Sequence, residues 1–190
     1  MAKVIVDVSM SLDGFVAGPN VRAAEPMGDG GERLHAWMGA GGPDGPIHAR
    51  ERTLVNGAVG ATIVGRTTFD LGHAPWGGTP WPGIPAFVVT HRPQQGFVGA
   101  NGGKFSFGGL TEAVEWAKEA AGSKDALVLG PDIARQLIGL RLADELWIHL
   151  VPILLGAGTR LLAGIEAELA PLWEPVGRTV THLHYAVVRP

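Results

Sequence analysis

Three turns that follow apolar runs carry residue types suited to binding a phosphate group. The first comprises Gly65, Arg66, Thr67 and Thr68, which follow the run Ala61–Gly65. Glycine admits a ligand close to the backbone, and a helix N-terminus with a cation and hydroxyls supplies donors for an anion. The alternative is an ordinary turn in which Thr67 or Thr68 caps a short helix through Leu71.

Two further turns repeat this arrangement. The run Ala126–Gly130 leads into a second turn made of Leu129, Gly130, Pro131, Asp132, Ile133 and Ala134. The run Pro85–Thr90 leads into Thr90, His91 and Arg92, which would suit a terminal phosphate such as the 2′-phosphate of an adenosine ribose. The alternative for the second turn is an ordinary capped turn with Asp132 as N-cap. The alternative for the third turn is a solvated basic pair. Ligands of open α/β sheets bind at strand carboxyl ends, so the three turns together favour a nucleotide site.

The elements that must position these turns are predicted from hydrophobic patterning. Continuous apolar runs such as Ala61–Gly65 are typical of strands buried on both faces of a parallel sheet. The predicted strands are Val4–Met10, Ala61–Gly65, Pro85–Thr90, Ala126–Gly130, Glu145–Leu155 and Val180–Arg189. The predicted helices are Gly31–Met38, Ile47–Val59, Thr111–Ala121 with Thr111 as cap, and Ile133–Ile138. The expected fold class is α/β, a mostly parallel sheet with an antiparallel C-terminal strand pair.

Length and composition narrow the class of protein. The sequence has 190 residues, 46% of them hydrophobic, with a formal net charge of −3, which favours a single globular domain without a nucleic-acid-binding basic face. Cysteine is absent, which excludes thiol nucleophiles and Cys-ligated zinc or iron–sulfur centres. There is no apolar run long enough for a membrane span, so we expect a cytoplasmic protein. The segment Leu155–Leu161 begins like a dinucleotide fingerprint but has Leu161 in place of the third glycine.

Four segments resemble the dihydrofolate-reductase-like family, and more closely its riboflavin-biosynthesis reductase (RibD C-terminal) type. They are Met10–Asn20, Val64–Phe69, Phe87–Pro93 and Leu142–Leu162. The resemblance covers nearly the whole sequence and implies one such domain over residues 1–190. It also implies a central, mostly parallel sheet flanked by helices, with NADPH as cofactor and hydride transfer to a pterin- or pyrimidine-like ring.

The resemblance assigns cofactor roles to the three turns. It implies that Gly65–Thr68 holds the pyrophosphate side and that Thr90–Arg92 lies by the adenosine ribose and its phosphate. The turn after Ala126–Gly130 would lie under the pyrophosphate and nicotinamide ribose, and Val16 and Ala17 in the first loop would line the nicotinamide.

One position departs from the family pattern, which usually has Gly-Gly where this sequence has Gly130-Pro131. A cis bond is far cheaper before proline than before glycine, so we predict a cis peptide between these two residues. Proline also lacks an N–H, which removes one donor for a phosphate.

Three residues are candidates for the proton donor that hydride transfer needs with many acceptors. Asp13 lies in the first loop, although Asp-Gly equally favours a tight turn. Glu32 is the nearest match to the helix carboxylate of dihydrofolate reductases, and a surface carboxylate is its alternative. His149 lies on one face of its strand with Glu145 and Trp147, and the resemblance points it toward the ring-binding site; a hydrogen-bonded, semi-buried histidine is the alternative.

No metal site is predicted. His182 and His184 have the i, i+2 spacing of a chelating pair on a strand, but the sequence shows no third ligand.

The predicted function is an NADPH-dependent reductase of a small heterocyclic or carbonyl substrate. The alternative is a dinucleotide-binding protein that keeps the fold without turnover. A reductase of the riboflavin pathway itself is disfavoured because the sequence lacks the zinc-binding deaminase signature. We expect neither nucleic acid nor membrane as partner, and we expect a homodimer whose contact includes Leu146–Leu162.

Overall fold

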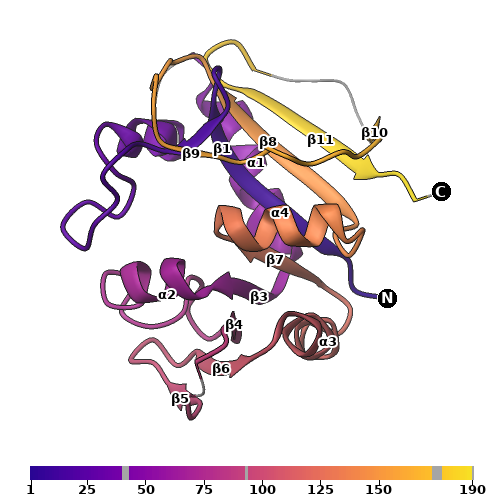
Figure 1. Cartoon of the computed structure of the whole chain (residues 1–190). Coiled ribbons are helices and arrows are strands. Elements are labelled where there is room, and N and C mark those ends of the chain that lie inside the picture. Colours follow the sequence, from indigo (N-terminus) through magenta and orange to yellow (C-terminus); the bar gives the residue numbers. More distant parts are fainter. Residues whose placement is uncertain (40–42, 93, 173–176, 190) are drawn as a thin grey trace.

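The computed structural model describes residues 1–39, 43–92, 94–172 and 177–189, and it is built on a nine-stranded sheet (Figure 1). The strand order is β10-β11-β8-β1-β7-β3-β4-β6-β5. The six central strands run parallel, and they are β8 (Glu145–Val151), β1 (Val4–Ser11), β7 (Asp125–Leu129), β3 (Val59–Gly65), β4 (Ala86–Val89) and β6 (Lys104–Gly108). The antiparallel strands are β11 (Thr181–Val187) and β10 (Leu169–Pro171) beside β8, and β5 (Phe97–Val98) beside β6. The expected mostly parallel sheet with an antiparallel C-terminal pair is therefore confirmed.

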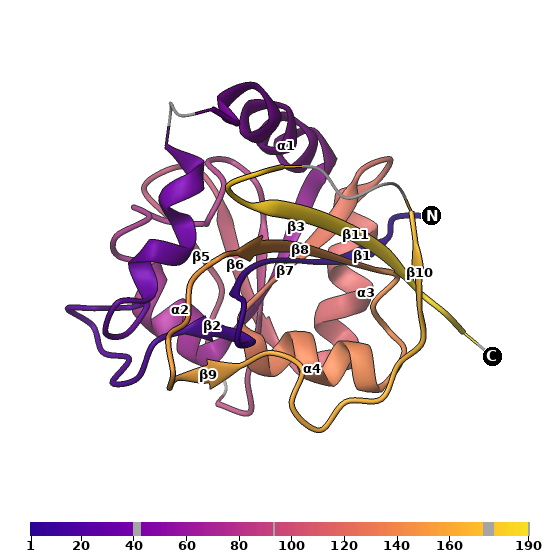
Figure 2. The same cartoon turned by 90° about the horizontal axis from the view of Figure 1, so that it is seen from above.

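Helices cover both faces of the sheet (Figures 1 and 2). One face carries α3 (Leu110–Ala121) and α4 (Pro131–Gly139), the other α1 (Gly45–Ala58), α2 (Arg66–Gly72) and the 3₁₀ helix η1 (Gly31–Met38). Side chains of β1 alternate between the two cores: Val4 and Val6 pack with α3 and α4, whereas Ile5 packs with Val55 of α1. No helix in the described parts of the chain has the length and apolarity to cross a membrane.

Helix starts differ from prediction in a consistent way. The N-caps of α2, α3 and α4 are Gly65, Gly109 and Gly130. The predicted caps, Thr67 or Thr68, Thr111 and Asp132, lie inside the helices instead, so those assignments are wrong. Each glycine lies directly before its helix in an extended or positive-φ conformation, and the N-cap is two or three residues earlier than predicted.

Several short strands escaped the sequence analysis. Strand β6 reads Lys-Phe-Ser-Phe-Gly, an alternation flanked by glycines rather than a continuous apolar run. A two-stranded sheet joins β2 (Phe15–Ala17) to β9 (Thr159–Arg160), and so connects two segments far apart in the sequence. Strand β8 ends at Val151, four residues before the predicted end at Leu155.

Candidate active site

Two of the three predicted phosphate turns are in contact. Strands β3 and β7 are neighbours with Val64 opposite Leu129, so the turns that follow them lie side by side. A β-carbon added at Gly130 would lie 2.4 Å from Thr68 Oγ1, and one added at Gly65 would lie 3.0 Å from the Ile133 side chain. Both glycines therefore allow the two turns to pack closely against each other, at the edge where a ligand of an α/β sheet binds.

The peptide bond between Gly130 and Pro131 is trans, because the described residues contain no cis bond, so the predicted cis bond is wrong. Gly130 takes φ of 103°, a conformation that glycine adopts without strain, and this turns the chain from β7 into α4. Pro131 occupies the first turn of α4, where its missing N–H breaks no helical hydrogen bond.

Two arginines approach this edge and are joined by one carboxylate. Arg66 Nε lies 2.8 Å from Asp70 Oδ1, and Arg92 Nη2 lies 3.0 Å from Asp70 Oδ2. The guanidinium of Arg66 lies 5.3 Å from the centre of the Phe69 ring. Burial would raise the pKa of Asp70, but its bonds from the two arginines lower it below the usual value. Asp70 therefore remains a carboxylate that aligns two cations, a role the sequence did not reveal.

The third turn borders a hollow of about 220 Å³. Its lining residues are Thr90, His91, Arg92, Phe107, Gly108 and Gly109. The hydroxyl of Thr90 accepts a hydrogen bond from the Arg92 backbone N–H at 3.0 Å, and the Arg92 side chain is 67% exposed. The structure thus places a hydroxyl and an accessible cation around one concavity, while Pro93 of the same motif lies outside the described residues.

Asp13 is held as a carboxylate by its neighbours. It accepts hydrogen bonds from Ser11 Oγ at 2.6 Å and from the backbone N–H groups of Gly156 at 2.8 Å and Leu155 at 3.2 Å. The Ser11 bond contributes most to lowering the pKa of Asp13 to about 2. Such a group is a poor proton donor near neutral pH, and the structure favours its alternative role in the turn.

Val16 and Ala17 are buried in β2 beside the glycine-containing segment at 155–161. Gly158 has φ of 134°, and a β-carbon there would lie 2.0 Å from the Ala17 carbonyl oxygen. The second glycine of this incomplete fingerprint therefore serves the close approach of β2, which is a structural role.

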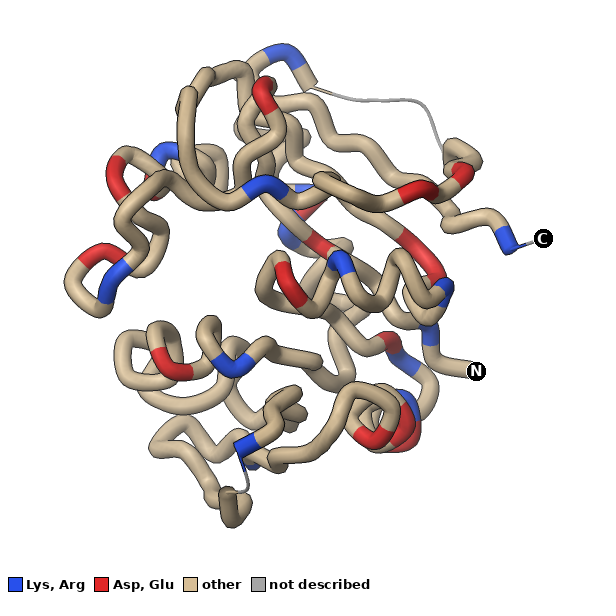
Figure 3. Tube along the Cα trace, in the orientation of Figure 1, with Lys and Arg blue, Asp and Glu red and all other residues tan. Residues whose placement is uncertain are grey.

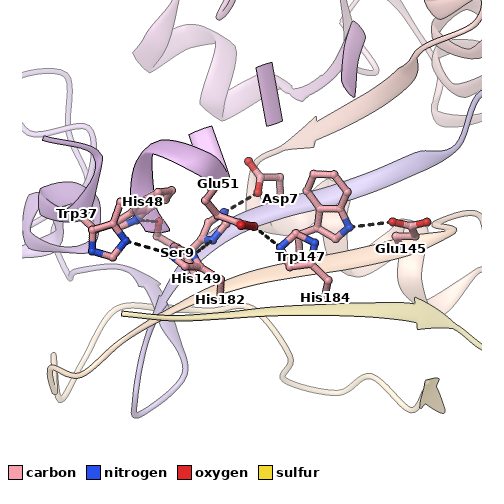
Figure 4. A network of polar contacts seen from close by, with 10 residues as sticks. All are labelled: Asp7, Ser9, Trp37, His48, Glu51, Glu145, Trp147, His149, His182 and His184. Carbon is pink, nitrogen blue, oxygen red and sulfur yellow. Dashed lines mark hydrogen bonds and ion pairs between the residues drawn. The ribbon is translucent and has the colours of Figure 1, made fainter. Parts of the chain in front are cut away.

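The other two candidate donors lie on different elements, Glu32 on η1 and His149 on β8. Glu32 is exposed in the first turn of η1. Three residues later, burial lowers the pKa of His35, and the charge of Asp7 opposes that shift. His149 is 1% exposed, and its Nε2 lies 2.8 Å from Asp7 Oδ1 (Figure 4).

Asp7 is thus the group that connects buried His149 to the surface, since its own side chain is 15% exposed. Asp7 follows Val6 on β1, and Val6 pairs with Val128 on β7. Asp7 is therefore one residue short of the level of Gly130 in the neighbouring chain segment. Sequence analysis missed it, although a charged residue inside the apolar run Val4–Met10 was a usable signal.

Of the two histidines considered as a chelating pair, His182 lies in a group of potential metal ligands, and this group does not include His184. Ligand atoms of Glu51, His149 and His182 all lie within 4.8 Å of one another. However, His149 Nδ1 and His182 Nδ1 are only 2.7 Å apart. Two nitrogens bound to one tetrahedral zinc ion would be about 3.3 Å apart, given Zn–N bonds of about 2.0–2.1 Å. The observed separation is that of a hydrogen bond.

Comparison with known proteins identifies the fold. No known family profile and no curated protein sequence matches the chain. A solved protein from Shewanella sp. PV-4, provisionally assigned to riboflavin biosynthesis, has a TM-score of 0.68 at 22% identity with 100% of both chains covered. Dihydrofolate reductase from Enterococcus faecalis, solved with NADP(H), has a TM-score of 0.55 at 15% identity, covering 97% of this chain and 96% of that one.

A two-activity enzyme of Thermotoga maritima, a pyrimidine deaminase and 5-amino-6-(5-phosphoribosylamino)uracil reductase, is also similar. Its TM-score is 0.64 at 10% identity, and the match covers 98% of this chain but 57% of that one. At these identities the likeness concerns architecture. The resemblance seen in the sequence is confirmed at that level: this chain has the dihydrofolate-reductase-like fold, in the form found in RibD proteins.

Proposed function

We propose that the protein is an NADPH-dependent reductase of a small heterocyclic or carbonyl substrate, carried on one domain over residues 1–190. The similar Enterococcus faecalis protein is a reductase solved with NADP(H), and the similar Thermotoga maritima protein includes a reductase activity on a pyrimidine. Figure 3 shows acidic and basic residues interspersed along the chain, which suits a small-molecule ligand better than a polyanion.

One observation carries the proposal: Arg66 and Arg92 are brought together by Asp70 at the ends of β3 and β4. One member of this pair, Arg92, lines the hollow together with Thr90 and His91. An accessible arginine with a neighbouring hydroxyl is suited to a phosphate monoester, which is the group that distinguishes NADPH from NADH.

The remaining contacts suit the other parts of this cofactor. The adjoining turns at Gly65 and Gly130 would hold the pyrophosphate, with the Thr68 hydroxyl as a donor. Bound NADPH would supply a hydride, and the protein would orient it and exclude water. Pro131 removes one backbone donor at this turn, so the two arginines would carry a larger share of the binding.

The first test is a titration of NADPH and NADH, followed by quenching of the six tryptophans. NADPH is expected to bind more tightly, and Arg92→Ala should remove most of that preference, about 10- to 100-fold, because a charged hydrogen bond contributes about 1.5–3 kcal/mol. Arg189→Ala is the matched control, since it also breaks an exposed arginine–aspartate pair, with Asp144. Absence of binding by both nucleotides would refute the proposal.

The missing N–H of Pro131 favours a second candidate, a protein that binds the dinucleotide without turnover. The two are separated by NADPH oxidation against a panel of dihydropterins, aminopyrimidines and quinones. Steady oxidation with any member excludes the binding-only candidate, whereas tight binding without oxidation across the panel supports it.

A further inference from the structure

A group of buried polar side chains lies between α1 and the sheet, where apolar packing would be usual (Figure 4). Glu51 comes from α1, His149 from β8 and His182 from β11, and each is at most 4% exposed. One ligand atom of each residue lies within 4.8 Å of those of the other two. Because polar groups are costly to bury without strong partners, so dense a cluster calls for a physical reason.

The two histidines of this group point the same ring nitrogen at each other. His149 and His182 are paired across β8 and β11, and their Nδ1 atoms are 2.7 Å apart. Glu51 adds a carboxylate, which has two oxygens and can bind His184 through one and a cation through the other. Two imidazoles and one carboxylate are a ligand set that proteins use for divalent iron with further positions left open.

The distance between the two nitrogens distinguishes between kinds of ion. Neighbouring ligands of an octahedral ion are about 90° apart, so metal–nitrogen bonds of about 2.1 Å would place the two nitrogens about 3.0 Å apart. The hydrogen-bonded pair at 2.7 Å would then have to open by about 0.3 Å, which is about half the change that a tetrahedral zinc ion would need. Rotation about the broad χ2 torsions of the two histidines can supply a change of this size.

Each of the two rings is held from its other side by an outer partner. Asp7 Oδ1 lies 2.8 Å from His149 Nε2, and His48 Nδ1 lies 3.0 Å from His182 Nε2. An ion bound at Nδ1 requires each ring to carry its hydrogen on Nε2, where Asp7 and His48 can accept it. Outer partners of this kind fix the orientation of metal-binding histidines, so the two rings are already aimed for a shared ion.

The surroundings of the group also suit a cation. As carboxylates, Glu51 and Asp7 bring two negative charges, which match the charge of a divalent ion. Trp37 of η1 covers the two imidazoles, with its ring centre 4.5 Å from that of His149 and 5.0 Å from that of His182. Such an apolar cover keeps water away and strengthens the attraction between an ion and its ligands.

We propose that Glu51, His149 and His182 bind one octahedral divalent transition-metal ion, of the class of Fe²⁺, Mn²⁺ and Co²⁺. The ion is bound by Nδ1 of both histidines and by one oxygen of Glu51. It takes the place of the hydrogen between the two nitrogens, which leaves as a proton. The ion thereby ties α1 to β8 and β11. This site does not depend on the proposed reductase function, because it is tested without nucleotide or substrate.

Titration of the metal-free protein with Co²⁺ tests the site directly. Calorimetry should give one ion per chain, and the visible absorption of the bound ion should be weak, as it is for octahedral Co²⁺. In ¹⁵N-histidine NMR of the wild type, Co²⁺ should shift or broaden the ring signals of His149 and His182 and leave those of the exposed His91 unchanged. Absence of binding, intense absorption typical of tetrahedral Co²⁺, or an effect on His91 alone would each overturn the proposal.

Two conservative variants test the ligand and the outer partner separately. Glu51→Gln keeps the shape of the side chain but removes a charged ligand, so it should weaken Co²⁺ binding about 100-fold or more, and Asp7→Asn should weaken it about 10- to 100-fold. Glu145→Gln is the matched control, since Glu145 is also buried on this sheet but is bonded to Lys3 and Trp147. Its Co²⁺ affinity should stay within about twofold of the wild type. An unchanged affinity in Glu51→Gln refutes the site.

Thermal unfolding gives a second readout, because an ion that ties α1 to the sheet binds the folded protein alone. Co²⁺ at about 100 times its Kd should raise the Tm of the wild type by roughly 5–10 °C. Glu145→Gln should show the same rise, and Glu51→Gln should show little of it. Equal rises in the wild type and Glu51→Gln would mean that the ion binds elsewhere, and the proposal would be wrong.

Discussion

Two aspartates six positions apart show how partners, rather than residue type, decide what a carboxyl group can do. Asp13 receives donors from a hydroxyl and two backbone N–H groups, which stabilise its ionised form. Asp7 instead lies 2.8 Å from Nε2 of the buried His149 imidazole. The sequence singled out Asp13 and did not single out Asp7, whose imidazole partner lies about 140 positions further along the chain.

His182 gives a residue-scale prediction about pH and stability. The pKa of His182 is about 4 in the folded protein, against an ordinary value of 6.5 in the unfolded chain. Between these two pH values the unfolded state therefore binds more protons than the folded state. Stability is therefore complete above about pH 6.5 and is lost as pH falls toward 4. Linkage gives a loss on the order of 2 kcal/mol at pH 5 relative to pH 7.5.

Urea unfolding at the two pH values measures this loss. His182→Gln should reduce the difference between them, and His91→Gln, a change at an exposed histidine, should leave it as in the wild type. An equal pH dependence in the wild type and His182→Gln would contradict the expectation.

At the scale of elements, the turn from β7 into α4 depends on one glycine. Gly130→Ala should destabilise the fold by about 1–3 kcal/mol, because φ of 103° is strained for alanine and the new β-carbon would meet Thr68. Gly57→Ala is the opposite case, since it lies within α1 with open space around it. It should stabilise by up to about 1 kcal/mol. Thermal unfolding of both variants checks the two signs, and equal shifts would show that the turn imposes no such constraint.

Elements were predictable wherever local patterning decides them. The continuous apolar runs became β3, β4 and β7, because a strand buried on both faces must be apolar throughout. The caps were not predictable from threonine and aspartate alone, since glycines end the strands and start the helices. The short strands β2 and β9 exist because they pair with each other, which local sequence does not record.

At the scale of the whole molecule, we predict a homodimer. Leu154 and Leu162, both in the segment expected to form a subunit contact, are 66% and 41% exposed. Sedimentation at micromolar concentration should give twice the chain mass of 19.9 kDa. The double change Leu154→Glu and Leu162→Glu should give a monomer, and Leu140→Glu, at an equally exposed leucine after α4, should not. A monomer mass for the wild type would contradict this prediction.

Some parts of the candidate site could be recognised from local sequence, and others depend on contacts between distant segments. The turns at Gly65, Thr90 and Gly130 could be found because each is a strand end that can be read in isolation. The contacts among Asp7, His149, His182 and His48 could not, because these residues come from β1, β8, β11 and α1 and meet only when the sheet has formed. Asp70 pairs with Arg66 within helix α2, but it gains its second partner only when the sheet brings Arg92 within its reach.

The ends of the large sheet have a consequence for how copies of this protein behave when crowded. One outermost strand, β10, has three residues including Pro171, and the other, β5, has two. A strand so short offers few open backbone groups, and proline offers no donor. A second molecule can therefore form few backbone hydrogen bonds with either edge of the sheet. We expect the native fold to resist fibre-like growth without needing charged residues at these edges.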